Sequence, residues 1–275
     1  MVSVVERART ILSDAVSRAL KIARPMNKAV DQRYVDGAVR SDGQAPVPTR
    51  SIVLCTEERT GSHYLCALMA STGVMGKPYE YFNEIRMRKH YPDYPDDPKT
   101  QLSWAYRLGT TKNGIFAVKL HTWMMARVLP AFDPRSEFPA PIFVQLIRRD
   151  LIGQAISLVR AEQSSQFDST DHALAEPVYD GPLIDHHVRE LAVREARWRT
   201  YFVRHQIEPL RLVYEELEHR PRKTVHRVAR FAGITSLRII GRKRWLIFER
   251  QRDGLNAEWR ARYLSEFGDV RRMDL

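Results

Sequence analysis

Short apolar runs alternate with amphipathic segments along most of the chain. Four runs rich in Val, Ile, Leu and Phe predict β-strands, at residues 51–56, 116–120, 141–147 and 209–214. Helical patterns follow most of these runs. Strands that alternate with helices in this way form mostly parallel sheets that are covered on both faces. The expected fold class is therefore α/β, with a mostly parallel, P-loop-like sheet flanked by helices on both faces.

Three segments show the periodicity of amphipathic helices most clearly. They cover residues 151–162, 188–205 and 223–232, and the last is entered through Pro221 and closed by Gly233. Residues 163–185 are polar and have no helical period. They predict a long loop of the kind that covers active sites.

The first fifty residues differ in character from the rest of the chain. Residues 4–23 place apolar side chains at helical spacing among arginines and lysines, which predicts a basic amphipathic helix. Packing of this helix on the domain or on a partner subunit is favoured over contact with an anionic membrane, and both readings stay open. Residues 36–50 are rich in Gly, Pro, Ser and Asp and predict a linker. We expect a helix and linker over 1–49 and one catalytic domain over 50–275.

The amino-acid composition limits the possible binding partners of the protein and its expected cellular compartment. The chain has 44 Lys and Arg against 33 Asp and Glu, a net charge of +11, which favours nucleic acid, a phosphorylated nucleotide or an acidic membrane face. The two cysteines, Cys55 and Cys66, have neither zinc-site spacing nor disulfide-scaffold density, so we expect buried thiols. Without an apolar run of ~20 residues or a signal-peptide pattern, a cytoplasmic location is expected, with the inner face of the membrane as an extension of it.

The junction between the first strand and the helix after it has the features of an anion site. It reads Thr-Glu-Glu-Arg-Thr-Gly-Ser-His-Tyr-Leu over residues 56–65. Backbone N–H groups of such a turn point at a ligand, and Gly61 allows a close approach. Arg59 adds a fork of donors, and Thr60 and Ser62 add hydroxyls. A plain capped turn is the alternative reading of the same residues.

A kinase or NTPase P-loop is the nearest competing motif. It requires a Gly-Lys-Ser/Thr sequence, which this chain does not contain. Sulfuryl transfer is an alternative to phosphoryl transfer at such a turn. Because a sulfuryl group carries less negative charge than a phosphoryl group, an arginine and backbone amides can stabilise its transfer. No metal is therefore expected.

A second motif follows the strand at 141–147. Arg149 stands at the carboxyl end of this strand, and Ser157 lies two helical turns further on. Ligands of open α/β sheets bind beyond the carboxyl ends of strands, so the turn at 56–65 and Arg149 are expected to face one crevice. Two anion sites in one crevice suit a nucleotide with separate 5′ and 3′ phosphates.

With these two motifs the sequence resembles the sulfotransferase superfamily. In that superfamily a Ser/Thr-rich loop with a Lys or Arg binds the 5′-phosphosulfate of 3′-phosphoadenosine-5′-phosphosulfate (PAPS), and an Arg…Ser pair binds the 3′-phosphate. Residues 59–62, 72–82 and 116–121 resemble the bacterial trehalose 2-sulfotransferase family more narrowly, and 212–217 and 250–259 agree with the superfamily. The donor-binding residues that the resemblance implies are Arg59, Thr60, Gly61, Ser62, His63, Tyr64, Arg149, Ser157, Arg250, Gln251 and Arg252.

The resemblance also implies catalytic residues. The glutamate of the family's Pro-x-Glu-Phe/Tyr-Phe segment is the proposed general base, and it corresponds to Glu80. His121, which follows a strand, is the competing base. Lys119 is expected to stabilise the leaving phosphate or contact a sugar, with an ordinary strand-end lysine as the alternative. This chain departs from the family at His63, where a small hydroxyl residue is usual.

The expected function is transfer of a sulfuryl group from PAPS to a hydroxyl of a carbohydrate or glycolipid, and the resemblance implies a homodimer. The alternatives are a basic module that binds nucleic acid or a membrane surface, and a divergent P-loop kinase. The two matched anion sites favour the enzyme, for which no nucleic-acid partner is expected.

Overall fold

A four-stranded parallel sheet forms the centre of the protein. The structure, a computed structural model, describes residues 46–166, 174–235, 237 and 254–269. The strand order is β2-β1-β3-β4, and every neighbouring pair is parallel. All four predicted strands are confirmed to within one residue at each end. Their bounds are Arg50–Thr56 (β1), Ile115–Leu120 (β2), Pro141–Ile147 (β3) and Leu210–Val213 (β4).

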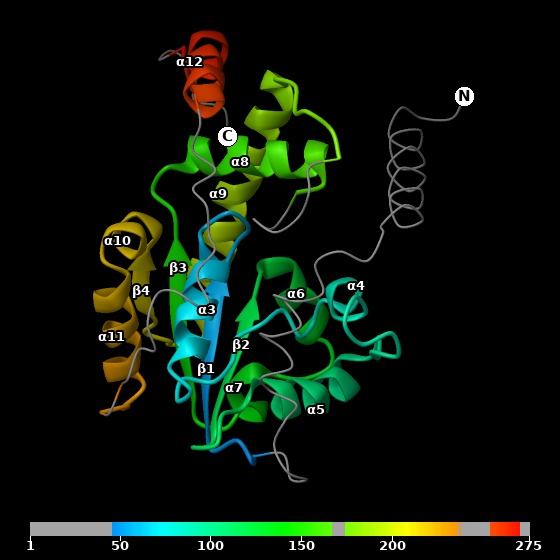
Figure 1. Ribbon diagram of the computed structural model, residues 1–275, viewed down its shortest axis with the longest axis vertical. Helices are drawn as coiled ribbons and strands as arrows, with labels where there is room; N and C mark the ends of the chain where they lie inside the picture. The colour runs from blue at the N-terminus through cyan, green and yellow to red at the C-terminus, as the bar shows by residue number, and fades with distance from the viewer. Residues whose placement is uncertain (1–45, 167–173, 236, 238–253, 270–275) are drawn as a thin grey trace.

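Helices cover both faces of this sheet, as predicted (Figure 1). Alternate residues of a strand point to opposite faces, so Ile52 and Leu54 pack with α3 and α11, whereas Val53 and Cys55 pack with α5, α6 and α9. The sequence alternates little within the strands because both faces are buried. The helices span Ser62–Ser71 (α3), Pro98–Gly109 (α5), Thr122–Val128 (α6), Gly181–Arg204 (α9) and Pro221–Phe231 (α11).

A third cluster of helices lies beyond the carboxyl ends of the strands (Figure 1). It consists of α8 (Leu151–Ser164), the first half of α9, and α12 (Gly254–Phe267), which pack around Trp259 and Tyr263. Arg260 of α12 forms an ion pair with Asp150, the N-cap of α8. This contact ties the end of the described chain to the turn that follows β3.

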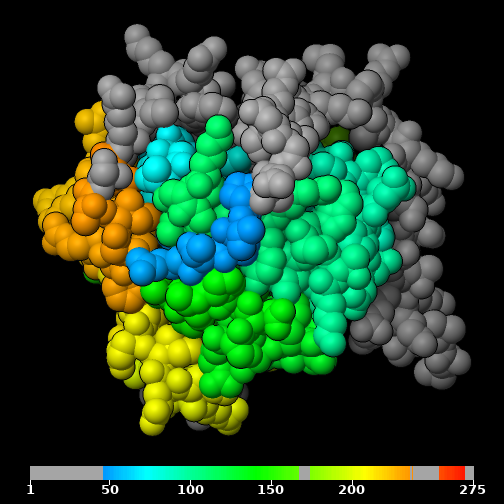
Figure 2. Space-filling view, turned by 90° about the horizontal axis from the view of Figure 1, so that it is seen from below, coloured from blue at the N-terminus to red at the C-terminus, as the bar shows by residue number. Residues whose placement is uncertain are grey.

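Short helices complete the described chain. They are α4 (Glu84–Met87), α7 (Pro134–Glu137) and α10 (Tyr214–His219). At the opposite end of the molecule, where the strands begin, the blue start of the described chain crosses the surface beside the orange helix α11 (Figure 2). The site described below lies at the carboxyl ends of the strands, away from this surface.

The predicted loop over 163–185 is wrong at both of its ends. Helix α8 continues to Ser164, and α9 begins at Gly181 rather than at 188. Asp180 accepts a hydrogen bond from the backbone N–H of Leu183, and Pro182 stands in the first turn, so the helix starts where these residues place it. Residues 167–173 of the predicted loop lie outside the described residues.

Both cysteine thiols are buried and unpaired, as predicted. Burial raises the pKa of the Cys66 thiol to about 12, and it also raises that of Cys55. Among the helices of the described residues, none is long and apolar enough to cross a bilayer. The predicted N-terminal helix lies outside the described residues, so the division of the chain at residue 50 stays a prediction.

Candidate active site

The turn between β1 and α3 is the place where the sequence predicts an anion site, and Gly61 determines its shape. Gly61 is the N-cap of α3 and has a φ of 74°. A Cβ at Gly61 would lie 2.6 Å from the ring of Tyr214, so only glycine fits there. Glycine has no side chain with which to cap the first turn. The first turn of α3 therefore has no side-chain cap, and backbone N–H groups at such a helix start favour an anion.

Three segments meet around this loop. Nε of Arg59 donates to Oγ of Ser157 at 2.9 Å, so α8 contacts the loop through one of the predicted donor-binding residues. Arg148 donates to the carbonyl oxygen of Arg59 at 3.1 Å and lies over the ring of Tyr214, 5.0 Å from its centroid. Arg59 has a φ of 61°, a conformation that these contacts hold in place. Arg148 was not among the site residues predicted from the sequence.

The side chain of Arg149 is mostly exposed, and the hydroxyl of Thr60 is buried within the protein. The Arg149 side chain is 64% exposed, and one of its nitrogens lies 3.4 Å from Glu216. The hydroxyl of Thr60 is buried, 2.6 Å from that of Thr56, so it braces the loop. Contacts of both residues with a donor stay predictions. Arg250, Gln251 and Arg252 lie outside the described residues.

A buried carboxylate lies beside the loop and gathers several predicted site residues. Oε1 of Glu80 lies 2.6 Å from Nζ of Lys119, 3.3 Å from Nε2 of His63 and 3.6 Å from Nε2 of His121. Oε2 of Glu80 accepts from Nδ2 of Asn83 at 2.8 Å. The structure thus brings Glu80, Lys119, His121 and His63 into one group, which we call the Glu80 cluster.

Strand geometry explains how Lys119 reaches Glu80. Val118 and Leu120 pack with α5 and α6, so Lys119 points to the opposite face, which α3 covers. The backbone N–H of Lys119 also donates to the carbonyl oxygen of Tyr79 at 3.0 Å. This bond holds the segment that carries Glu80 against β2.

The charges of the cluster keep Glu80 ionised. Burial alone would raise the pKa of this carboxyl group, but Lys119, Arg86 and the hydrogen bond from His63 together hold its pKa well below its usual range. Asn83 adds a further donor. Glu80 is therefore a carboxylate whose negative charge is compensated by its neighbours.

Glu57 and Glu58 form a second acidic group, which sequence reasoning missed. Glu57 is buried and accepts from Trp198 at 2.8 Å and from the backbone N–H of Thr122 at 3.0 Å. Burial raises its pKa, although His121 opposes the shift. Burial would raise the pKa of Glu58 as well, but His121 and Arg194 lower it to about 2. The two glutamates of the Thr-Glu-Glu-Arg sequence were the available signal.

Glu57, Glu58 and His121 can also be considered as metal ligands. One potential ligand atom from each residue lies within 4.8 Å of the others. The Glu57 and Glu58 side chains already accept from Thr122, Trp198, Trp123 and Arg194, which accounts for much of their charge without an ion. Catalysis without a metal stays a prediction.

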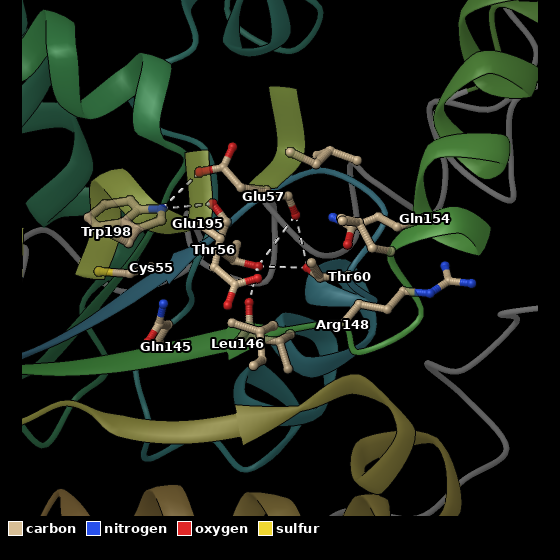
Figure 3. Close-up of a pocket in the computed structure, with 13 residues that line it drawn as sticks. Cys55, Thr56, Glu57, Thr60, Gln145, Leu146, Arg148, Gln154, Glu195 and Trp198 are labelled. Carbon is tan, nitrogen blue, oxygen red and sulfur yellow. Dashed lines mark hydrogen bonds between the residues drawn. The ribbon is translucent and has the colours of Figure 1, made fainter. Parts of the chain in front are cut away.

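A small cavity lies behind the loop, between the ends of β1 and β3 and helices α8 and α9 (Figure 3). Glu57 and Thr60 border it from the loop, Arg148 and Gln154 from the β3–α8 side, and Trp198 from α9. The side chain of Gln154 donates to the carbonyl oxygen of Glu58 at 2.7 Å. Glu80, Lys119 and His63 do not border the cavity, so it is separate from the Glu80 cluster.

An α/β fold with an uncapped helix start after its first strand and an ionised carboxylate nearby suits an enzyme that transfers an anionic group. The family model described as Stf0 sulphotransferase matches residues 51–266, and the chain therefore belongs to this sulfotransferase family. This membership confirms the resemblance seen in the sequence. It favours the enzyme over a binding module or a kinase.

Two curated relatives are close enough to align over most of their length. The trehalose 2-sulfotransferase of Mycolicibacterium smegmatis is 27% identical over 78% of this chain and 94% of the relative. The trehalose 2-sulfotransferase of Mycobacterium tuberculosis is 26% identical over 60% of this chain and 77% of the relative.

Two solved structures resemble the chain more distantly. A sulfotransferase domain from the curacin biosynthetic pathway is 14% identical, with a TM-score of 0.42 over 70% of this chain and 76% of that domain. A sulfotransferase domain from the Synechococcus PCC 7002 olefin synthase is 13% identical, with a TM-score of 0.41 over 86% of this chain and all of that domain.

Proposed function

We propose that this sulfotransferase moves the sulfuryl group of PAPS to a hydroxyl group of a carbohydrate. The observation that carries the proposal is the contact between His63 and Glu80, at 3.3 Å. His63 belongs to the first turn of α3, whose amino end suits an anion, and Glu80 belongs to a buried charged cluster. A donor at the loop therefore has its reactive end next to groups that can move a proton.

The donor site is built from the loop and the β3–α8 turn. Backbone N–H groups at the start of α3 and the Arg59 guanidinium suit the phosphosulfate. Arg149 and Ser157 are proposed for the 3′-phosphate. Arg148 orients the loop through the carbonyl oxygen of Arg59 and is therefore a positioning residue.

The reaction is proposed to proceed in line. The acceptor oxygen forms a bond to sulfur as the bond between sulfur and the 5′-phosphate oxygen breaks, which releases adenosine 3′,5′-bisphosphate. The proton of the acceptor hydroxyl leaves through the Glu80 cluster, in which sequence reasoning favoured Glu80 or His121 as the base. Lys119 compensates the charge of Glu80 at 2.6 Å.

A sugar acceptor is proposed from the names of the two curated relatives, both trehalose 2-sulfotransferases. Glycolipids that carry the same sugar are included in the proposal. A homodimer, a cytoplasmic location and membrane contact through residues 4–23 stay predictions.

Nucleotide binding tests the donor assignment. We expect adenosine 3′,5′-bisphosphate to raise the melting temperature more than ADP or AMP does, since a ligand at about 100 times its Kd stabilises by about 2.7 kcal/mol. Arg59→Ala and Arg149→Ala should reduce the shift, whereas Arg135→Ala, a change at a surface ion pair with Asp133, should leave it intact. Equal shifts with all three nucleotides would contradict the donor assignment.

Transfer of radiolabelled sulfate from PAPS tests the acceptor. Trehalose should become labelled in preference to monosaccharides and to protein tyrosine, and Glu80→Gln should abolish the labelling. Binding of polyanions that weakens steeply with salt, without any transfer, would instead indicate the basic binding module.

A further inference from the structure

The Glu80 cluster differs strongly in the accessibility of its members. The side chains of Glu80, Lys119 and His121 are 8%, 2% and 5% exposed, whereas that of His63 is 32% exposed. A general base must come within hydrogen-bond reach of the acceptor hydroxyl. His63 is the member of the cluster whose side chain is most exposed, and it is therefore the most accessible to an acceptor.

Glu80 is poorly suited to accept the proton itself. Its oxygens already receive hydrogen bonds or ion pairs from Lys119, His63 and Asn83. These neighbours hold the pKa of Glu80 well below its usual range, against the effect of burial. A carboxylate with a lowered pKa is a weak base, but it stabilises a positive charge beside it.

We propose that His63 is the general base of this enzyme and that Glu80 orients it. The inference rests on the proposed function. It differs from the role that the family resemblance implies for Glu80, and it concerns a position where this chain departs from the family. A neutral imidazole that donates from Nε2 to Glu80 carries its lone pair on Nδ1, as in a carboxylate–histidine pair.

The proposed step is balanced. The acceptor hydroxyl gives its proton to Nδ1 of His63 while its oxygen bonds to sulfur, and the electrons of the broken sulfur–oxygen bond leave with adenosine 3′,5′-bisphosphate. The resulting imidazolium is paired with Glu80 and later releases its proton to solvent. Lys119 is a positioning residue, because it keeps Glu80 ionised when His63 is neutral.

Other ionisable groups surround the pair and bear on its pH dependence. They are Lys119 of β2, His121 at the end of that strand, Arg86 of α4 and the Cys66 thiol of α3. With His63 as the base, the dependence of kcat/KM on pH should differ between wild type and His63→Ala.

The test compares His63→Ala with wild type and with His219→Ala, a change at an exposed histidine at the end of α10. Sulfuryl transfer from PAPS to trehalose should fall by about 10²–10⁴-fold in His63→Ala. The melting-temperature shift with adenosine 3′,5′-bisphosphate should stay as in wild type. Imidazole added to His63→Ala should restore part of the rate, and His219→Ala should behave as wild type.

Distinct results would overturn the inference. If wild type is active and His63→Ala keeps the same rate and pH profile, His63 is not the base. If activity is then lost in Glu80→Gln but not in His63→Ala, Glu80 is the base. A His63→Ala variant that loses the nucleotide shift shows a donor-binding role instead. A wild type that transfers no sulfuryl group overturns the proposed function itself.

Discussion

The Nζ atom of Lys119 lies 2.6 Å from Oε1 of Glu80, and both side chains are almost fully removed from solvent. A buried charge is costly unless an opposite charge and hydrogen bonds compensate it. Here the Lys119–Glu80 pair joins β2 to the segment before α4, and the Glu80 carboxylate remains ionised near the start of α3. The site therefore depends on this pair for its charge and for its shape.

Removal of Lys119 should destabilise the protein strongly. In Lys119→Met the Glu80 carboxylate loses its nearest cation, so we expect a loss of about 3–5 kcal/mol in the free energy of unfolding, measured by denaturant titration. Lys112→Met, at an exposed position beside the same strand, should change it by less than about 0.5 kcal/mol. The double variant Lys119→Met/Glu80→Gln should be more stable than Lys119→Met alone. An equal loss in both would mean that the pair contributes packing rather than charge.

Glu58 should contribute stability that disappears in acid. Its pKa of about 2 lies below the ordinary value of about 4.3, so the contribution is complete above about pH 5 and is lost as the pH falls towards 2. Glu58→Gln should therefore cost about 2–3 kcal/mol at pH 7 and much less at pH 2. Unfolding measured between pH 2 and 7 tests this, with Glu208→Gln, at an exposed position, as the control. A constant difference across this range would contradict the electrostatic explanation.

Gly61 should tolerate no side chain. It has a φ of 74°, and a Cβ would lie 2.6 Å from the ring of Tyr214. Gly73 has a similar φ of 69° but no described atom within 4 Å of the same position. We expect Gly73→Ala to cost about 1–2 kcal/mol for the backbone conformation, and Gly61→Ala about 2–5 kcal/mol because the contact adds to it. Gly61→Ala should also weaken the binding of adenosine 3′,5′-bisphosphate, and equal costs for the two variants would show that Tyr214 moves aside.

Trp198 should stabilise the fold through one hydrogen bond to a buried carboxylate. Its indole nitrogen donates to Glu57 at 2.8 Å, and Glu57 is buried enough for its pKa to be raised. Trp198→Phe removes the donor and leaves a small cavity, so we expect a loss of about 2–4 kcal/mol by denaturant titration. Trp123→Phe removes a similar indole bond, to Glu58, from a partly exposed side chain, and it should cost less than about 1 kcal/mol. Similar losses in the two variants would argue against burial as the cause.

The sequence by itself determined the α/β architecture and the position of the turn between β1 and α3. Apolar runs bounded by turn residues predicted all four strands, because strands that are buried on both faces must be apolar along their length. The Arg-Thr-Gly-Ser sequence predicted a turn before α3, since glycine at a left-handed position before a helix is a local requirement. Glu80, Lys119, His63 and His121 were all named from sequence, although as separate candidates.

Only the tertiary structure decided how these residues meet. Parallel pairing of β1 and β2 places Lys119 and His121 near the loop, and no local period in the sequence records that contact. The roles of Glu57, Glu58, Arg148 and Trp198 depend on partners from distant segments. Helix α9 starts at the Asp180 cap, which could not be recognised within the polar segment of the sequence. Burial and neighbouring charge set the pKa values of Glu57, Glu58 and Glu80, and both are properties of the packed structure rather than of residue type.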